Sequence, residues 1–254
     1  PIFEYFLELA PSPAPRLAGD RLVEPEEPRF SAFVFKIQAN MNPAHRDRIA
    51  FLRIVSGRFQ RGMEVQHVRL GKKVRLSQPQ QFMAQDRTIV ETAYPGDIIG
   101  VFDPGIFRIG DSLCEGGNRF KFEGIPTFPS EHFARINPVD TMKRKQFVKG
   151  ISQLASEGAI QVFTLPDAGM ESVIIGAVGI LQFEVLEHRL KHEYGVDIRL
   201  QHLPYRFARW PDATFDDIKK MNLTSSTLAA EDNEGRPVLL FENEWSINWA
   251  IERN

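Results

Sequence analysis

The sequence has a single cysteine, Cys114, among its 254 residues, so no disulfide can form within the chain. One thiol fits a reducing compartment. The chain also lacks an apolar run long enough to span a bilayer and a cleavable signal pattern. We therefore expect a cytoplasmic location and no membrane partner. With 43% hydrophobic and 25% charged residues, the composition is that of a globular protein of one or two domains.

Motifs of nucleotide chemistry are missing as well. Residues 57–63 read "GRFQRGM", with Met63 where the phosphate loop G-x-x-x-x-G-K-[ST] requires lysine. "LGKKV" contains a Gly-Lys pair but lacks the earlier glycine and the following Ser or Thr. The chain alone is therefore not expected to bind or hydrolyse a nucleoside triphosphate, and no enzyme activity is predicted for it.

Other catalytic and metal patterns are weak. His188 and His192 lie four residues apart, but zinc needs three or four ligands. Cys114 has no evident histidine partner and is expected to be a small apolar filler. The carboxylates in "DPG" (103–105) and "PDAG" (166–169) are explained by turn chemistry, although a catalytic pair stays possible. No catalytic, cofactor-binding or metal-ligating residue is predicted.

Charge is distributed unevenly along the chain. Residues 41–80 hold nine Lys or Arg against two acids, whereas residues 211–254 hold four against nine. A local basic excess attracts polyanions even when the whole chain carries a net charge of only -2. The basic block is either an RNA- or phosphate-binding surface or a solvated surface, and composition leaves both open.

The pattern changes four times along the chain. "IFEYFLELA" has helical periodicity and ends at "PSPAPR", so residues 11–28 are expected to be an extended linker. From 29 to 122, short Val-, Ile- and Phe-rich runs separated by glycines predict an antiparallel β-barrel or sandwich. "EGIPTFPSE" at 123–131 predicts a second linker.

Residues 132–254 predict an α+β domain. Strand and helix patterns follow in the order βαββαβ, the ferredoxin-like arrangement. Asp140 and Gly158 are placed to begin and end the first helix, and Gly195 to end the second. Beyond residue 211, "FDDIKKM" predicts a short helix, "TSSTLAAEDNEG" an exposed loop, "RPVLLFEN" a strand and "SINWAIER" a terminal helix.

In the segment "RIAFLRIV" at 48–55, the strand pattern assigns apolar and basic side chains to different positions. Because side chains alternate along a strand, Ala50, Leu52 and Ile54 share the cleaner apolar face and should point inward. Arg48 and Arg53 should then face outward or lie at the barrel rim.

Several segments resemble a known family. "RGMEVQHVRLGKK", "YPGDIIGVFD" and "IGDSLCEG" are similar, in order and spacing, to the second domain of translational GTPases. "IQANMNPAHRDRIAFLRIVSGRF", "FEGIPTFPSEHFARI" and "GISQLASEGAIQVF" look like the bacterial class-II release factors, the release factor 3 family. Elongation factor G would carry "GELHLE" where residues 179–184 read "GILQFE". The resemblance covers residues 11–211 well and the tail loosely.

The resemblance implies a multi-domain β plus α+β fold. Residues 1–28 would be the end of a GTPase-domain helix and a linker, residues 29–122 the β-barrel, and residues 132–254 the ferredoxin-like domain with a C-terminal extension. The GTPase domain has no counterpart in these 254 residues, so a fragment is expected, with GTP or GDP and Mg²⁺ binding elsewhere in the parent.

The implied function is in translation termination. The parent would be a ribosome-dependent GTPase that releases class-I release factors, and this part would bind small-subunit RNA and protein and transmit nucleotide state from its own GTPase domain. The alternatives are a generic RNA-binding β-barrel module, the equivalent fragment of an elongation factor, and an intact small enzyme. Basic residues of both domains are the candidate ribosome contacts: His45, Arg46, Arg48, Lys72, Lys73, Arg75, Lys143, Arg144, Lys145 and Lys149.

Overall fold

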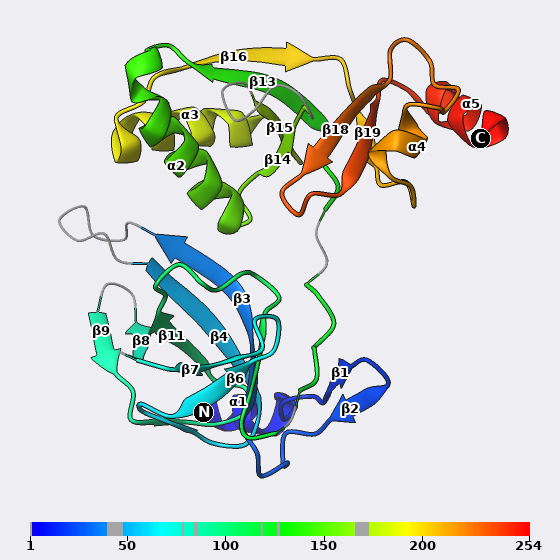
Figure 1. The fold of residues 1–254 in the computed structure, drawn as a ribbon. Helices are drawn as coiled ribbons and strands as arrows, with labels where there is room; N and C mark the ends of the chain where they lie inside the picture. Colours follow the sequence, from blue (N-terminus) through cyan, green and yellow to red (C-terminus); the bar gives the residue numbers. More distant parts are fainter. Residues whose placement is uncertain are drawn as a thin grey trace. The chain divides into compact units, whose positions relative to one another are not determined.

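The chain is described by a computed structural model that covers residues 2–39, 48–77, 79–83, 86–117, 119–125, 128–165 and 173–254. It forms two compact units, residues 1–126 and 127–254 (Figure 1). The division between the units falls inside the stretch 123–131, where the prolines predict a linker.

The first unit is an antiparallel β-barrel domain, as predicted. Its main sheet has the strand order β7-β6-β12-β3-β4-β11-β8-β9, and a separate short pair joins β5 to β10. One cluster of buried apolar side chains fills it, and both β5 and β10 contribute to that cluster. The strands are β3 (Ser31–Ala39), β4 (Arg48–Ser56), β5 (Phe59–Gln60), β6 (Glu64–His67), β7 (Lys72–Arg75), β8 (Gln80–Met83), β9 (Asp86–Ile89), β10 (Thr92–Ala93), β11 (Ile98–Phe102) and β12 (Ser112–Cys114).

Strand β4 is central to this sheet and pairs with β3 on one side and β11 on the other. The predicted inward face is confirmed, since Ala50, Leu52 and Ile54 all lie in the barrel core. The opposite face is covered too, because Val55 packs in a second cluster with Phe33. Both faces of "RIAFLRIV" therefore contribute buried apolar side chains.

The second cluster exists because residues 16–23 fold back on the barrel. Strands β1 (Arg16–Ala18) and β2 (Arg21–Val23) form an antiparallel hairpin. Ala18 and Val23 from this hairpin pack with Phe122 in the same cluster as Val55. The prediction that residues 11–28 form an extended linker is therefore wrong for the hairpin. Residues 16–23 contain no proline, and Gly19 makes the turn.

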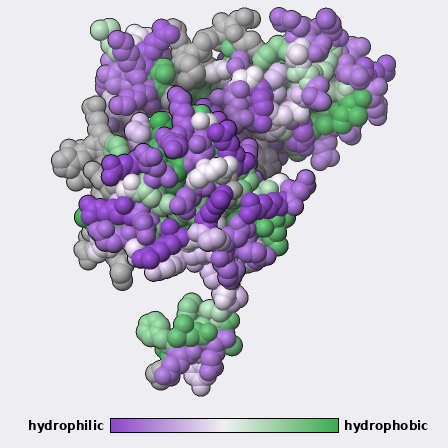
Figure 2. All heavy atoms as spheres, turned by 60° about the horizontal axis from the view of Figure 1, so that its bottom comes forward, coloured by the Kyte–Doolittle hydropathy of each residue, from purple (hydrophilic) through white to green (hydrophobic). Residues whose placement is uncertain are grey.

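Helix α1 (Ile2–Leu9) is present as predicted, but none of its residues is buried. Its large apolar side chains are 64–82% exposed, and they form the hydrophobic cluster at the lower end of Figure 2. No helix within the described residues, α1 included, has the length and apolar character needed to cross a membrane.

The second unit contains the predicted ferredoxin-like arrangement. Strands β13 (His132–Pro138), β14 (Gln161–Thr164), β15 (Val173–Ala177) and β16 (Ile198–Leu203) lie in the order β16-β13-β15-β14. Helices α2 (Arg144–Ser156) and α3 (Leu181–Tyr194) pack on the same face and share one core with the strands (Figure 1).

The predicted helix ends of this unit are confirmed. The carboxylate of Asp140 accepts from the Met142 amide and caps a 3₁₀ turn, Thr141–Lys143, that leads into α2. Gly158 follows α2 with φ +74°, and Gly195 closes α3 with φ +67°. These left-handed positions suit glycine because it has no side chain to clash.

The C-terminal extension continues the sheet of the second unit. Strands β18 (Leu228–Asp232), β19 (Pro237–Phe241) and β17 (Phe207–Arg209) follow β14, with helices α4 (Phe215–Ile218) and α5 (Glu244–Arg253). The prediction of an exposed loop at 224–235 is wrong for β18. Ala230 is fully buried, and the strand pairs with both β14 and β19, so distant partners stabilise a segment of weak local preference.

We predict that Gly57→Ala destabilises the first unit far more than Gly19→Ala. Both glycines have positive φ, +68° and +64°, so each substitution carries a conformational cost of about 1–2 kcal/mol. A Cβ on Gly57 would also lie 2.5 Å from the backbone of Arg29 and Phe30, whereas nothing lies within 4 Å of one on Gly19. Urea unfolding should show a loss at least about twice as large for Gly57→Ala. Equal losses would contradict the close packing at Gly57.

Candidate functional site

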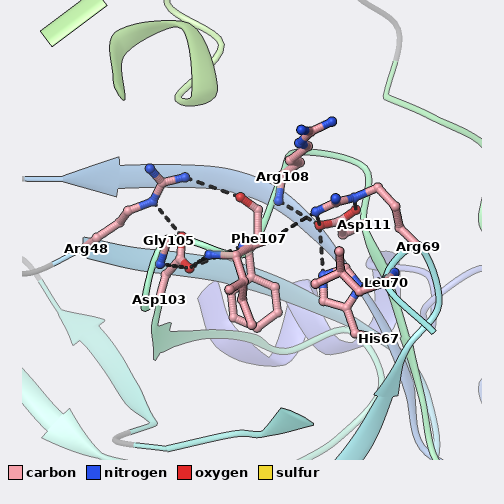
Figure 3. A network of polar contacts seen from close by, with 10 residues as sticks. Arg48, His67, Arg69, Leu70, Asp103, Gly105, Phe107, Arg108 and Asp111 are labelled. Atoms are coloured by element: carbon pink, nitrogen blue, oxygen red, sulfur yellow. Dashed lines mark hydrogen bonds and ion pairs between the residues drawn. The ribbon is translucent and has the colours of Figure 1, made fainter. Parts of the chain in front are cut away.

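The loop between β11 and β12 is held at its start by the buried carboxylate of Asp103 (Figure 3). Its Oδ1 accepts from the amides of Gly105, Ile106 and Phe107 at 2.7, 2.9 and 3.3 Å. Its Oδ2 accepts from Nε of Arg48 at 2.6 Å, and Arg48 also donates to the Phe107 carbonyl at 3.3 Å. The predicted turn at "DPG" is thus confirmed, with its charge neutralised by an arginine.

A second buried carboxylate, Asp111, holds the end of the same loop. Arg69 donates two hydrogen bonds to this carboxylate, from Nε to Oδ1 at 2.6 Å and from an Nη to Oδ2 at 2.8 Å. The Arg108 amide donates to Oδ2 at 2.7 Å. Burial by itself raises the pKa of Asp111, but its contacts with Arg69, His67 and the Arg108 amide outweigh burial and lower the pKa from 3.8 to about 2.

His67 completes this network from inside the barrel. Its ring is fully buried and stacks on Phe107, with centroids 5.5 Å apart. Nδ1 accepts from the Leu70 amide at 3.4 Å, which assigns the ring proton to Nε2. Nε2 lies 3.0 Å from Oδ2 of Asp111 but outside hydrogen-bond geometry, so the contact is an electrostatic one.

The network gives Arg48 a structural contact. Its side chain is only 17% exposed and spans from the Asp103 carboxylate to a loop carbonyl. This agrees with the predicted rim position of Arg48, and its contact with RNA phosphate stays a prediction. His45 and Arg46, predicted as contacts beside it, lie outside the described residues.

Sequence reasoning missed most of this network. It placed Asp103 in a turn but gave no role to His67, Arg69 or Asp111. The available signal was an aspartate at each end of a nine-residue loop, "DPGIFRIGD", in a chain with arginines on the neighbouring strand and turn. The partners are 42 and 55 residues away in sequence, so only the fold brings them together.

Exposed basic residues remain on β7, which pairs with β6 at the edge of the sheet. Lys72, Lys73 and Arg75 are all exposed. Arg75 is folded back, with Nε donating to the Gly62 carbonyl at 3.1 Å. Neither Lys72 nor Lys73 shows an ion pair or a hydrogen bond to a side chain among the described residues. The two lysines are therefore available to an external anion.

Two other arginines of the basic block have internal partners. Arg61 pairs with Glu91 at 2.8 Å, and the guanidinium of Arg58 lies over the Tyr94 ring at 5.7 Å. Among the described residues of the block 41–80, several arginines thus have internal partners, whereas the lysine pair on β7 faces solvent.

The basic residues at α2 divide in the same way. Nζ of Lys143 donates to the Gly195 carbonyl at 2.6 Å, where it satisfies the C-terminal end of α3. Arg144, Lys145 and Lys149 are exposed. Lys145 and Lys149 are four residues apart and so lie on one helix face. Lys143 thus has a capping contact, and the basic face that remains is smaller than the sequence suggested.

No metal or nucleophile site emerges from the described part of the chain. His188 and His192 stack with ring centroids 4.0 Å apart, but no three His, Cys, Asp or Glu side chains of the described residues are grouped as metal ligands. Cys114 is fully buried in β12, which confirms the prediction of an apolar filler. Residues 166–169, with the predicted "PDAG" turn, lie outside the described residues.

We predict that Asp111→Asn lowers the unfolding free energy by about 2 kcal/mol at neutral pH, because it leaves the Arg69 guanidinium, whose side chain is 33% exposed, without its counter-charge. Since the folded pKa is lowered from 3.8 to about 2, the carboxylate stabilises the fold above pH 4 and loses this effect as pH falls through 2. Urea unfolding of both proteins at several pH values should show the difference shrinking over this range. The exposed Asp20→Asn serves as control, and a pH-independent difference would argue against the charge.

We also predict that Cys114 resists alkylation in the folded chain. Burial raises the pKa of its thiol to about 11, so little thiolate exists near pH 8. Iodoacetamide should modify the single cysteine slowly without urea and rapidly in denaturing urea, as measured by mass spectrometry. Equal rates in both conditions would contradict the buried position.

Both units are similar to domains of known proteins. Residues 29–116 match the model of elongation factor G domain 2, and residues 122–251 match the C-terminal domain of class-II release factor RF3. A solved structure from Thermus thermophilus aligns with 83% of this chain and 30% of its own, at a TM-score of 0.61 and 22% identity, which supports the fold alone.

Relatives named "Peptide chain release factor 3" match nearly the whole chain. The protein of Symbiobacterium thermophilum is 66% identical over 99% of this chain and 47% of its own length. The protein of Nostoc punctiforme is 46% identical over 98% of this chain and 46% of its own length. The protein of Listeria welshimeri is 46% identical over 98% of this chain and 47% of its own length. The chain thus spans about half the length of the curated relatives it matches. It belongs to the class-II release factor family, release factor 3.

Proposed function

We propose that this chain is the ribosome-binding and conformational-coupling part of a translation termination factor. The observation that carries the proposal is the match of both units, in order, to domains of translation factors. A barrel of the elongation factor G type followed by a release factor C-terminal domain favours a termination factor over the elongation factor alternative.

The full-length factor would promote GTP-dependent release of class-I release factors from the ribosome. GTP or GDP and Mg²⁺ would bind to its GTPase domain, because these 254 residues carry no phosphate loop. The two units described here would move with that domain, so that the bound nucleotide biases one of two overall arrangements. Both the ribosome and the class-I factors are cytoplasmic partners in this proposal.

The contact with small-subunit RNA would use solvent-facing lysines. Lys72 and Lys73 lie together on the β7 edge, and Lys145 and Lys149 lie on one face of α2. Phosphate contacts of this kind give affinity without reading bases, which suits a rigid barrel that docks on folded RNA. In the second unit the aromatic residue between Lys145 and Lys149, Phe147, is fully buried and cannot serve as a base-stacking platform, so this face would contact phosphate or protein.

A generic RNA-binding module is the second candidate, favoured only by the basic excess of residues 41–80. It differs from the first proposal in its ligand. Specific binding to free RNA hairpins, with no binding to ribosomes, would support the generic module instead.

We predict that Lys72→Glu with Lys73→Glu, made in the full-length factor, weakens ribosome binding and reduces its salt dependence. The slope of log affinity against log salt should fall in magnitude by about one for each phosphate that a lysine no longer neutralises. Lys219→Glu with Lys220→Glu is the matched control, because it reverses another exposed pair of adjacent lysines, in the acidic extension. Ribosome sedimentation at several salt concentrations measures both.

If the β7 pair and the control pair change binding equally, a specific contact at β7 is excluded. Circular dichroism of both variants should match the parent protein, since all four lysines are exposed.

A further inference from the structure

Helix α5 presents an aromatic face that the proposed function does not use. Trp245 and Trp249 lie one turn apart, with ring centroids separated by 5.5 Å. Trp245 is 63% exposed. The other side of the helix packs on the extension, where Ile247 and Ala250 join the cluster around Leu239. The helix is therefore fixed to the second unit while Trp245 faces solvent.

This face already holds one guanidinium. The Cζ atom of Arg253 lies 4.8 Å from the centre of the Trp249 ring, four residues away along the helix. Cations are attracted to the negative face of an indole ring, and tryptophan binds them best among the aromatic side chains. Among the described residues, no cation lies over Trp245, so this equivalent ring one turn earlier is open to a cation from outside.

The charge around the helix favours a cationic ligand. Residues 211–254 contain nine acids and four bases. On α5 itself, Glu244 and Glu252 are exposed. Glu252 lies seven residues after Trp245, about two helical turns, and so on the same face. A region of this charge repels the phosphates of RNA and attracts Arg and Lys side chains.

We propose that the α5 face formed by Trp245, Trp249 and Glu252 binds an arginine-rich segment of a partner protein. One guanidinium would stack on Trp245 as Arg253 stacks on Trp249, and a second would pair with the Glu252 carboxylate. Arginine is favoured over lysine because its planar, weakly hydrated guanidinium stacks on aromatic faces and pairs with carboxylates through two hydrogen bonds. This goes beyond the proposed function, since it assigns a protein-binding surface that requires no RNA contact.

The test titrates the 254-residue chain with a synthetic peptide of alternating Arg and Ser. Tryptophan fluorescence should change on binding, and calorimetry gives the affinity. We expect Trp245→Ala to lose most of the fluorescence change and to bind about two- to fivefold more weakly. Glu252→Gln should weaken binding and reduce its salt dependence.

Trp210→Phe is the control variant. Trp210 donates to Asp232 at 2.8 Å and packs near Phe163, so it belongs to the sheet rather than to α5. This variant should bind the peptide with unchanged affinity. Thermal unfolding should show that Trp245→Ala folds normally, because most of the Trp245 ring contacts water.

Three results would overturn the proposal: unchanged affinity in Trp245→Ala, equal affinity for the matching Lys–Ser peptide, and self-association of the chain that Trp245→Ala abolishes. The last would show that a second copy occupies the face. The variant with Lys72→Glu and Lys73→Glu should bind the peptide normally. A negative result with the peptide would therefore leave the ribosome proposal intact, and a negative result with the ribosome would leave the peptide proposal intact.

Discussion

The burial of strand β4 on both of its faces is the constraint on which the first unit depends. Its inward side chains fill the barrel core, and Val55 on the other face packs with the β1–β2 hairpin and Phe122. A strand covered on one side only would leave an apolar surface in water. The hairpin and the segment around Phe122 therefore belong to the folded domain, although both lie outside the main sheet.

The buried carboxylates of Asp103 and Asp111 explain why Arg48 and Arg69 lie partly buried in a folded β-domain. Each carboxylate satisfies loop amides that no strand partner reaches, and each then requires a cation nearby. Arg48 and Arg69 supply these cations. Among the described basic residues of the block 41–80, Arg48 and Arg69 thus compensate internal charge, whereas Lys72 and Lys73 on β7 face solvent.

The second unit shows how an extension can gain a surface of its own. Strands β18, β19 and β17 lengthen the ferredoxin-like sheet beyond β14, and α4 and α5 pack on this added part. Because α5 needs only one face for this packing, its other face is free to carry tryptophans. The extension is acidic where the barrel is basic, so the two units suit partners of opposite charge.

The sequence by itself determined the elements with strong periodicity or clear end signals: the βαββαβ order, the inward face of β4, the caps at Asp140 and Gly195, and the family. Local rules suffice there, because alternation, capping and glycine turns act within a few residues. Tertiary structure alone decided the hairpin at 16–23, strand β18, and which basic side chains have partners within the protein. Those outcomes depend on partners such as Asp103 for Arg48 and Gly195 for Lys143, which lie 55 and 52 residues away and meet only when the chain folds.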